Sequence, residues 1–224
     1  ISIVVISAIY NSTNELEVIS GLAAKNIEKA NEALKSMFER HSQIAKDLSC
    51  YQIVQDLITQ LINEAYLTII KVNDSKKIEP YLMDEMYSYG ERLSTLIISH
   101  YLKLFIPERN PQYFDVRKVL ITDDQFGMAI PQIDQIKESY IRNKSEFKNT
   151  LIITQGFIGC TPKGETTTLG REGSDYSGTL LAEMINAKEV QIWTDVPGVA
   201  TIDPNELDSA IFLSSISYEE AACM

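Results

Sequence analysis

The sequence predicts an α/β fold built around a mostly parallel β-sheet. Short apolar, β-branched runs alternate with longer segments of helical periodicity, and the connections in the second half of the chain are short. This alternation is typical of parallel strands joined by crossover helices. The 224 residues are enough for one or two domains with a sizeable core, and we find no internal repeat among them.

The chain opens with a predicted strand and a polar turn. Residues 1–6 form a continuous apolar run, which is typical of a strand buried on both faces. The polar residues 7–14 follow it, so we place them at the carboxyl end of the sheet, where open α/β folds usually bind ligands. A helix is expected to begin near Asn14.

Long helices are predicted next. Residues 25–72 carry apolar side chains at spacings of three and four nearly throughout, and a further helix is expected from about Tyr81 to Phe105. Glu91 falls roughly opposite the apolar stripe of that last helix, so helical geometry alone favours a solvent-facing acid. Gly90 beside it is unfavourable inside a helix, which indicates that another segment packs closely there.

Shorter elements fill the second half of the chain. We expect strands within 112–122, at 151–154 and at 189–194, and helices that start near Pro131, span 175–187 and start near Ser217. Glu220 stands three residues after Ser217, which is the spacing of a capping box.

Glycines are concentrated between residues 164 and 178, which we place as a loop between a strand and a helix. Gly170 and Gly173 allow the backbone to approach an anion closely, and Arg171 adds a planar donor fork. Ser174 or Asp175 is expected to cap the following helix. The alternative is a long surface loop before a capped helix, and the spacing alone does not choose between the two.

Composition excludes several classes of protein. The net charge of -11 argues against a nucleic-acid binder. The three cysteines form no Cys-x-x-Cys pair, and with only two histidines they give little support to a metal site. Such cysteine usage fits a reducing compartment, so a cytoplasmic location is expected. No apolar run of 18 residues is present, so we expect no membrane association.

Hydroxyl groups, an arginine and two aspartates follow the predicted strands. They are Thr13, Arg171, Ser174, Asp175, Thr194 and Asp195. No Ser-His-Asp set, Walker P-loop or protein-kinase motif accompanies them. Groups of this kind suit the handling of phosphate together with a metal ion.

Several distinctive motifs lie along the chain. They include Tyr-Gly-Glu-Arg-Leu-Ser at 89–94, Phe-Asp-Val-Arg at 114–117, Gln-Gly-Phe-Ile-Gly at 155–159, Thr-Thr-Thr-Leu-Gly-Arg at 166–171, Gly-Ser-Asp at 173–175 and Trp-Thr-Asp-Val-Pro-Gly at 193–198. With these motifs the chain resembles the catalytic domain of the aspartate kinases, in the amino-acid kinase superfamily. The resemblance implies a three-layer αβα sandwich with a helical insertion at about 25–105. It also implies that residues 1–224 are one catalytic domain, incomplete at both ends. The family's Lys-Phe-Gly-Gly-Thr-Ser start, its Phe-Gly-Ala-Lys segment and its ACT regulatory domains are missing, so we expect this stretch alone to be a poor catalyst.

The same resemblance implies an activity and residue roles. The family transfers the ATP γ-phosphoryl group to the side-chain carboxylate of L-aspartate, the first step of lysine, threonine and methionine biosynthesis, with Mg²⁺ carried by the nucleotide. Arg171 is expected to hold the substrate α-carboxylate, Glu91 the α-ammonium, and Thr13 and Ser7 the attacking carboxylate. Ala8 and Ser174 complete the aspartate side, and Asp175 orients the catalytic groups. The predicted nucleotide side consists of Thr194, Asp195, Ala200 and Asn205. A homo-oligomer is expected for the full-length protein.

Departures from the family leave other readings open. Glu172 replaces a usual glycine, and we expect its side chain to point to solvent. Ala200 replaces a frequent tyrosine, and Asn205 an arginine. They motivate the alternative of a catalytically impaired, kinase-like amino-acid-binding or regulatory module. A kinase for glutamate or acetylglutamate is another alternative, although an acetylated amine would offer no ammonium to Glu91.

Overall fold

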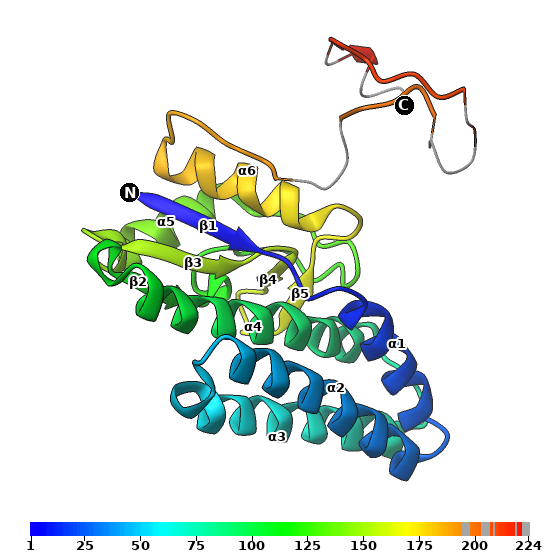
Figure 1. Cartoon of the computed structure of the whole chain (residues 1–224). Helices are drawn as coiled ribbons and strands as arrows, with labels where there is room; N and C mark the ends of the chain where they lie inside the picture. The colour runs from blue at the N-terminus through cyan, green and yellow to red at the C-terminus, as the bar shows by residue number, and fades with distance from the viewer. Residues whose placement is uncertain (194–197, 203–206, 208, 218, 221–224) are drawn as a thin grey trace. The chain divides into compact units, whose positions relative to one another are not determined.

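The structure is a computed structural model that describes residues 1–193, 198–202, 207, 209–217 and 219–220 (Figure 1). It divides into two units, residues 1–190 and residues 191–224, and each is described by itself. The first unit holds the sheet and the long helices.

Three parallel strands form the main sheet. They are β1 (Ser2–Ile6), β2 (Pro111–Phe114) and β3 (Leu151–Gln155), in the order β1-β3-β2. Ser2 of β1 and Pro111 of β2 both pair with Leu151 of β3, so all three strands end at the same edge. A separate antiparallel pair is formed by β4 (Ile158–Cys160) and β5 (Thr166–Thr168).

Four helices separate β1 from β2, as the predicted helical insertion requires. They are α1 (Ser12–Ala23), α2 (Ile27–Asp47), α3 (Tyr51–Ser75) and α4 (Pro80–Phe105). Helix α5 (Ile133–Asn143) precedes β3, and α6 (Gly173–Ile185) follows β5. Short 3₁₀ turns lie at Pro107–Arg109, Val116–Lys118 and Lys144–Phe147.

The first unit is layered, which confirms the predicted sandwich. Figure 1 shows α6 on one face of the sheet and α4 on the other, with α2 and α3 packed beyond α4. One apolar core joins α1 to α4, around residues such as Leu16, Phe38 and Leu93. A second core joins α5 and α6 to the strands, around Ile136, Ile152 and Leu181. The central helix α4 is therefore covered on both sides.

Several expected elements differ from those observed. Strand β1 is not buried on both faces: Val4 is 37% exposed, because among the described strands β1 pairs only with β3 at the edge of the sheet. Helix α1 begins at Ser12 rather than near Asn14, so Thr13 lies in its first turn. Residues 189–193 form no strand, and Trp193 is 89% exposed. Strand propensity alone does not decide whether a segment forms a strand, because tertiary context outweighs it.

The glycine-rich segment is more ordered than a loop. Residues 166–168 pair with 158–160, and helix α6 already begins at Gly173. The sequence pattern does not indicate this hairpin, because strands of three residues are too short to show an alternation of apolar and polar side chains.

The described part of residues 191–224 contains one isolated antiparallel bridge, between Ala200 and Phe212. It also contains the predicted capping box. The Ser217 N–H donates to Glu220 Oε2 at 2.9 Å, and the Glu220 N–H donates to Ser217 Oγ at 3.2 Å.

Candidate active site

A cleft of about 410 Å³ lies at the carboxyl ends of β1 and β3. It is lined by Ser7, Ala8, Thr13, Glu91, Phe157 and the run Gly170 to Asp175. All seven residues predicted for the aspartate side and for catalysis are in this set. These seven residues come from three segments that are far apart in the sequence, namely 7–13, Glu91 and 171–175, so the fold brings them together.

Glu91 forms the buried wall of the cleft. Its side chain is only 3% exposed, and its Oε2 is a buried atom with no hydrogen-bond partner in the described part of the chain. Burial raises the pKa of the Glu91 carboxyl to about 8, although hydrogen bonds from the Glu91 and Ala8 backbones act in the opposite direction. The expectation of a solvent-facing acid from helical geometry is therefore wrong. Helix α4 is enclosed on its second face by the start of α1 and the turn after β1.

The turn after β1 is fixed against α4. Ser94 Oγ donates a hydrogen bond of 2.7 Å to the carbonyl of Ser7. A Cβ on Gly90 would lie 3.1 Å from Ala8 Cβ and 3.5 Å from Ser12 Cβ. The close packing that this glycine predicted is thus confirmed, and it places Ala8 and the first turn of α1 against helix α4.

Residues 156–157 connect the sheet to the start of α6. The Phe157 N–H donates to Ser177 Oγ at 2.9 Å, and the Leu169 N–H donates to the Phe157 carbonyl at 2.9 Å. Phe157 has a φ of +66°, a strained conformation for a bulky residue. A Cβ on Gly156 would lie 2.8 Å from Ser174 Cα, so glycine is required for this approach. The resemblance gave Phe157 no role, although this residue lies in the Gln-Gly-Phe-Ile-Gly motif at 155–159.

Arg171 lies on a tight turn at the mouth of the cleft. Gly170 has a φ of +78° and Glu172 a φ of +57°, so both residues beside Arg171 are left-handed. The Arg171 side chain is exposed and forms no ion pair with any described residue. The N-terminus of α6 begins two residues later, and its dipole favours an anion there. This turn is therefore suited to a carboxylate.

The predicted cap of α6 is wrong. Neither Ser174 nor Asp175 precedes the helix; the N-cap position is Glu172, and its side chain makes no capping bond. The helix starts two residues earlier than predicted because the turn at Gly170 and Glu172 directly precedes its first helical turn. In that first turn, the Asp175 N–H donates to the Glu172 carbonyl at 3.1 Å. Ser174 and Asp175 are thereby free to face the cleft. Glu172 is exposed, as expected, and it also lines the cleft.

The residues predicted to bind the nucleotide cannot be compared with the cleft. Thr194, Asp195 and Asn205 lie outside the described residues, and Ala200 belongs to the second unit. The described residues contain no group of three or more His, Cys, Asp or Glu side chains arranged to hold a metal ion. None of the described helices combines the length and the apolar character needed to span a membrane.

Residues 2–223 match the sequence model of the amino acid kinase family. The chain belongs to the amino acid kinase family.

The chain is similar in sequence to aspartokinases and in structure to a solved aspartokinase. The chain is 38% identical to lysine-sensitive aspartokinase 3 of Escherichia coli, over all of the chain and 49% of that protein. It is 31% identical to the aspartokinase of Chlamydia pneumoniae, over 98% of the chain and 46% of the relative. The crystal structure of E. coli aspartokinase III in complex with aspartate and ADP superimposes with a TM-score of 0.90 at 36% identity, covering the whole chain and 49% of that structure. The chain therefore spans about half the length of the relatives it matches.

Proposed function

We propose that the protein containing this chain is an aspartate kinase, which forms 4-phospho-L-aspartate from L-aspartate and ATP. The observation that carries the proposal is the cleft. It brings together Glu91, a buried acid whose Oε2 has no hydrogen-bond partner in the described part of the chain, and Arg171, which has no ion-pair partner among the described residues. The likeness to an aspartokinase solved with aspartate and ADP supports the same conclusion.

The two ends of the cleft suit the two charges of an amino acid. Arg171 offers a planar fork that matches a carboxylate, and the start of α6 adds a favourable dipole. Glu91 Oε2 has no hydrogen-bond partner among the described residues, and an α-ammonium group would supply one. An ammonium beside this carboxyl would also lower its pKa and favour the ionised form. We assign recognition of the amino-acid backbone to these two residues.

The remaining residues orient the reacting side chain. A side-chain carboxylate oxygen of aspartate attacks the γ-phosphorus of ATP; the new O–P bond forms while the bond to the β-phosphate oxygen breaks, and that electron pair leaves with ADP. The attacking carboxylate is already ionised at neutral pH, so it needs no general base. Ser7, Ala8, Thr13 and Ser174 position it, and Asp175 orients the neighbouring groups. Catalysis is then mainly alignment.

We propose the nucleotide side on the resemblance alone, with Thr194, Asp195, Ala200 and Asn205 as its residues. Mg²⁺ bound to the nucleotide would supply neutralisation of the phosphoryl charge. A cytoplasmic location and a role in lysine biosynthesis belong to the same proposal, and so does a homo-oligomeric full-length protein. The free thiols of Cys50 and Cys160 fit a reducing compartment.

The test is aspartate-dependent phosphoryl transfer by the full-length protein, with hydroxylamine to trap the acyl phosphate as a hydroxamate. Glutamate and N-acetylglutamate are assayed beside aspartate. We expect turnover with aspartate, and Arg171→Ala should raise the KM for aspartate about ten- to hundredfold, as for the loss of a charged hydrogen-bond pair. Arg142→Ala on α5 is the control, because Arg142 does not line the cleft.

Other results would redirect the proposal. Turnover with glutamate or N-acetylglutamate instead of aspartate would make the protein a different carboxylate kinase. Binding of aspartate without turnover would favour an amino-acid-binding module. Neither binding nor turnover would contradict the proposed function altogether.

A further inference from the structure

A second buried carboxylate of α4, Asp84, lies outside the cleft. It precedes Glu91 by seven residues, which is about two helical turns, so the two acids share one face of the helix about 10 Å apart. Asp84 is 1% exposed and does not line the cleft. Nothing in the proposed chemistry uses it.

Asp84 accepts three hydrogen bonds from two other segments. Its Oδ2 accepts from the Thr168 N–H and from the Gly127 N–H, both at 2.9 Å. Its Oδ1 accepts from Thr168 Oγ1 at 2.8 Å. Burial raises the pKa of the Asp84 carboxyl, while these three bonds act in the opposite direction. A buried acid whose three hydrogen bonds come from the end of strand β5 and from the loop at Gly127 holds these two segments in place.

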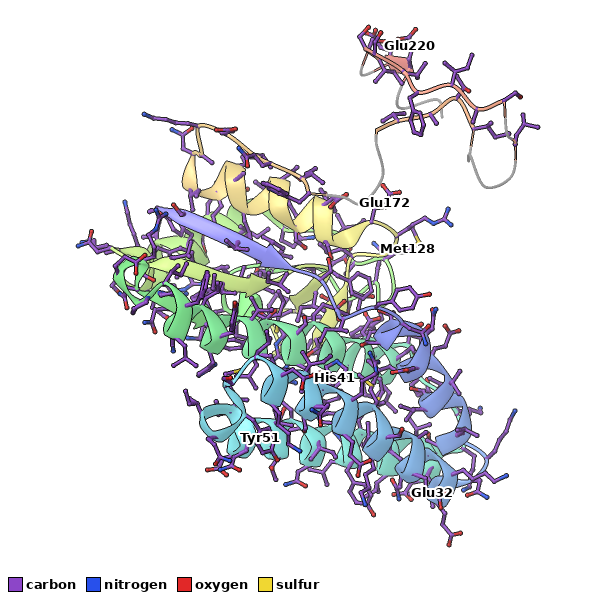
Figure 2. All side chains as sticks on the ribbon, viewed as in Figure 1. Glu32, His41, Tyr51, Met128, Glu172 and Glu220 are labelled. Atoms are coloured by element: carbon purple, nitrogen blue, oxygen red, sulfur yellow. The ribbon has the colours of Figure 1, made fainter. Side chains whose placement is uncertain are left out.

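Both segments that Asp84 holds lie close to Arg171, one in the sequence and the other by packing. Thr168 ends β5, and Arg171 follows it by three residues. Residues 127–128 pack against Gly170, which lies between Thr168 and Arg171 in the sequence. A Cβ on Gly170 would lie 3.3 Å from the Gly127 carbonyl oxygen and 3.2 Å from Met128 Cγ. The two segments are also joined directly, since the Ala129 N–H donates to the Thr168 carbonyl at 2.9 Å. Met128 and Glu172 lie at the same end of the domain in Figure 2.

We propose that Asp84 is a positioning residue that sets the place of Arg171 relative to Glu91. Helix α4 carries Glu91 itself. Through Asp84 the same helix also holds the end of β5 and the segment at Gly127, and these two segments pack against the turn that carries Arg171. The spacing of the two groups that recognise the amino acid is thereby fixed by α4. This inference rests on the proposed function of the cleft.

The test compares three variants of the full-length protein. Asp84→Ala removes all three bonds, and we expect the KM for aspartate to rise about tenfold or more, while the KM for ATP changes less than about twofold. Asp84→Asn should restore the KM for aspartate to within about threefold, because its oxygen still accepts the two backbone N–H groups and its amide donates to Thr168 Oγ1. Tyr89→Phe is the matched control on α4. It removes a buried hydroxyl that contacts Thr68 on α3, so it should lower stability and leave the KM for aspartate unchanged.

Amide hydrogen exchange of residues 169–173 gives a readout that does not depend on activity. We expect exchange to be about tenfold faster in Asp84→Ala and near normal in Asp84→Asn. If Asp84→Ala does not fold, Thr168→Val removes only the Oγ1 bond and should raise the KM for aspartate about threefold.

The outcomes separate the two proposals. An unchanged KM for aspartate in Asp84→Ala, or equal exchange in all variants, would overturn the role of Asp84. Equal defects in Asp84→Ala and Asp84→Asn would also overturn it, since charge rather than geometry would then matter. A wild-type protein without turnover would contradict the kinase function, while the exchange experiment would still decide whether Asp84 holds the Arg171 turn.

Discussion

At the scale of single residues, the cleft is defined by an acid that burial keeps protonated and an arginine left free to bind. Glu91 is buried, and its Oε2 has no hydrogen-bond partner in the part of the chain that the structure describes, whereas Arg171 is exposed on a turn. A polar group that is buried without a partner destabilises the empty protein. A ligand that supplies an ammonium to one and a carboxylate to the other would remove that cost.

The pKa of Glu91 predicts how stability depends on pH. The folded value of about 8 lies above the ordinary value of 4.5. Below both values the carboxyl is protonated in both states, and as the pH rises from about 4.5 to about 8 only the unfolded state loses the proton. The stability of the wild type should therefore fall across this window, by on the order of a few kcal/mol. Glu91→Gln, which cannot ionise, should lack this loss when urea unfolding is measured at pH 5, 7 and 8.5.

Ligand binding supplies the complementary check. Aspartate should release a proton from Glu91 at pH 7, so its calorimetric binding enthalpy should differ between phosphate and Tris buffers. Identical pH dependence in the wild type and Glu91→Gln, with no buffer dependence, would mean that Glu91 is already ionised in the empty cleft.

Glu172 predicts an effect of backbone strain. Its φ of +57° disfavours any residue with a Cβ, whereas glycine adopts it freely. Glu172→Gly should therefore stabilise the protein by about 0.5–1 kcal/mol in urea unfolding. Glu172→Gln keeps the strain and removes the charge, so it should leave stability unchanged. If Gln stabilises as much as Gly, repulsion by the carboxylate and not strain is the cause.

At the scale of elements, the junction between β3 and α6 sets the position of the turn that carries Arg171. Gly156 allows the strand end to touch Ser174 at the start of α6. Helix α4 contributes Glu91 to the same cleft, and Gly90 lets this helix approach Ala8. Close approaches at two glycines therefore bring segments that line the cleft together.

Substitution of one glycine tests this junction. In Gly156→Ala the new Cβ would lie 2.8 Å from Ser174 Cα, so the start of α6 must move. We expect a loss of about 1–3 kcal/mol in stability and a higher KM for aspartate. Gly178→Ala in the same helix is the matched control, since nothing lies within 4 Å of its Cβ, and it should stabilise the protein by up to about 1 kcal/mol. An unchanged KM in Gly156→Ala would show that the junction does not position the turn.

At the scale of the whole molecule, local patterns predicted most of the helices and the parallel sheet, and motif resemblance predicted seven of the residues that line the cleft but not Phe157. Three features could not be predicted from local sequence patterns because they depend on tertiary contacts. The exposure of β1 depends on its neighbours, the burial of Glu91 on what covers the second face of α4, and the role of Asp84 on a strand 84 residues away. The i, i+7 spacing of Asp84 and Glu91 was the one available signal for the last of these.

The most direct measurement is a calorimetric titration of the full-length protein with L-aspartate and with N-acetyl-L-aspartate. The two ligands share both carboxylates, and only the first carries an ammonium group. If Glu91 and Arg171 recognise the two ends of the amino acid, L-aspartate should bind at least about tenfold more tightly, and Arg171→Ala should weaken its binding by a similar factor. Equal binding of the two ligands, or aspartate affinity unchanged in Arg171→Ala, would contradict the assignment of the cleft.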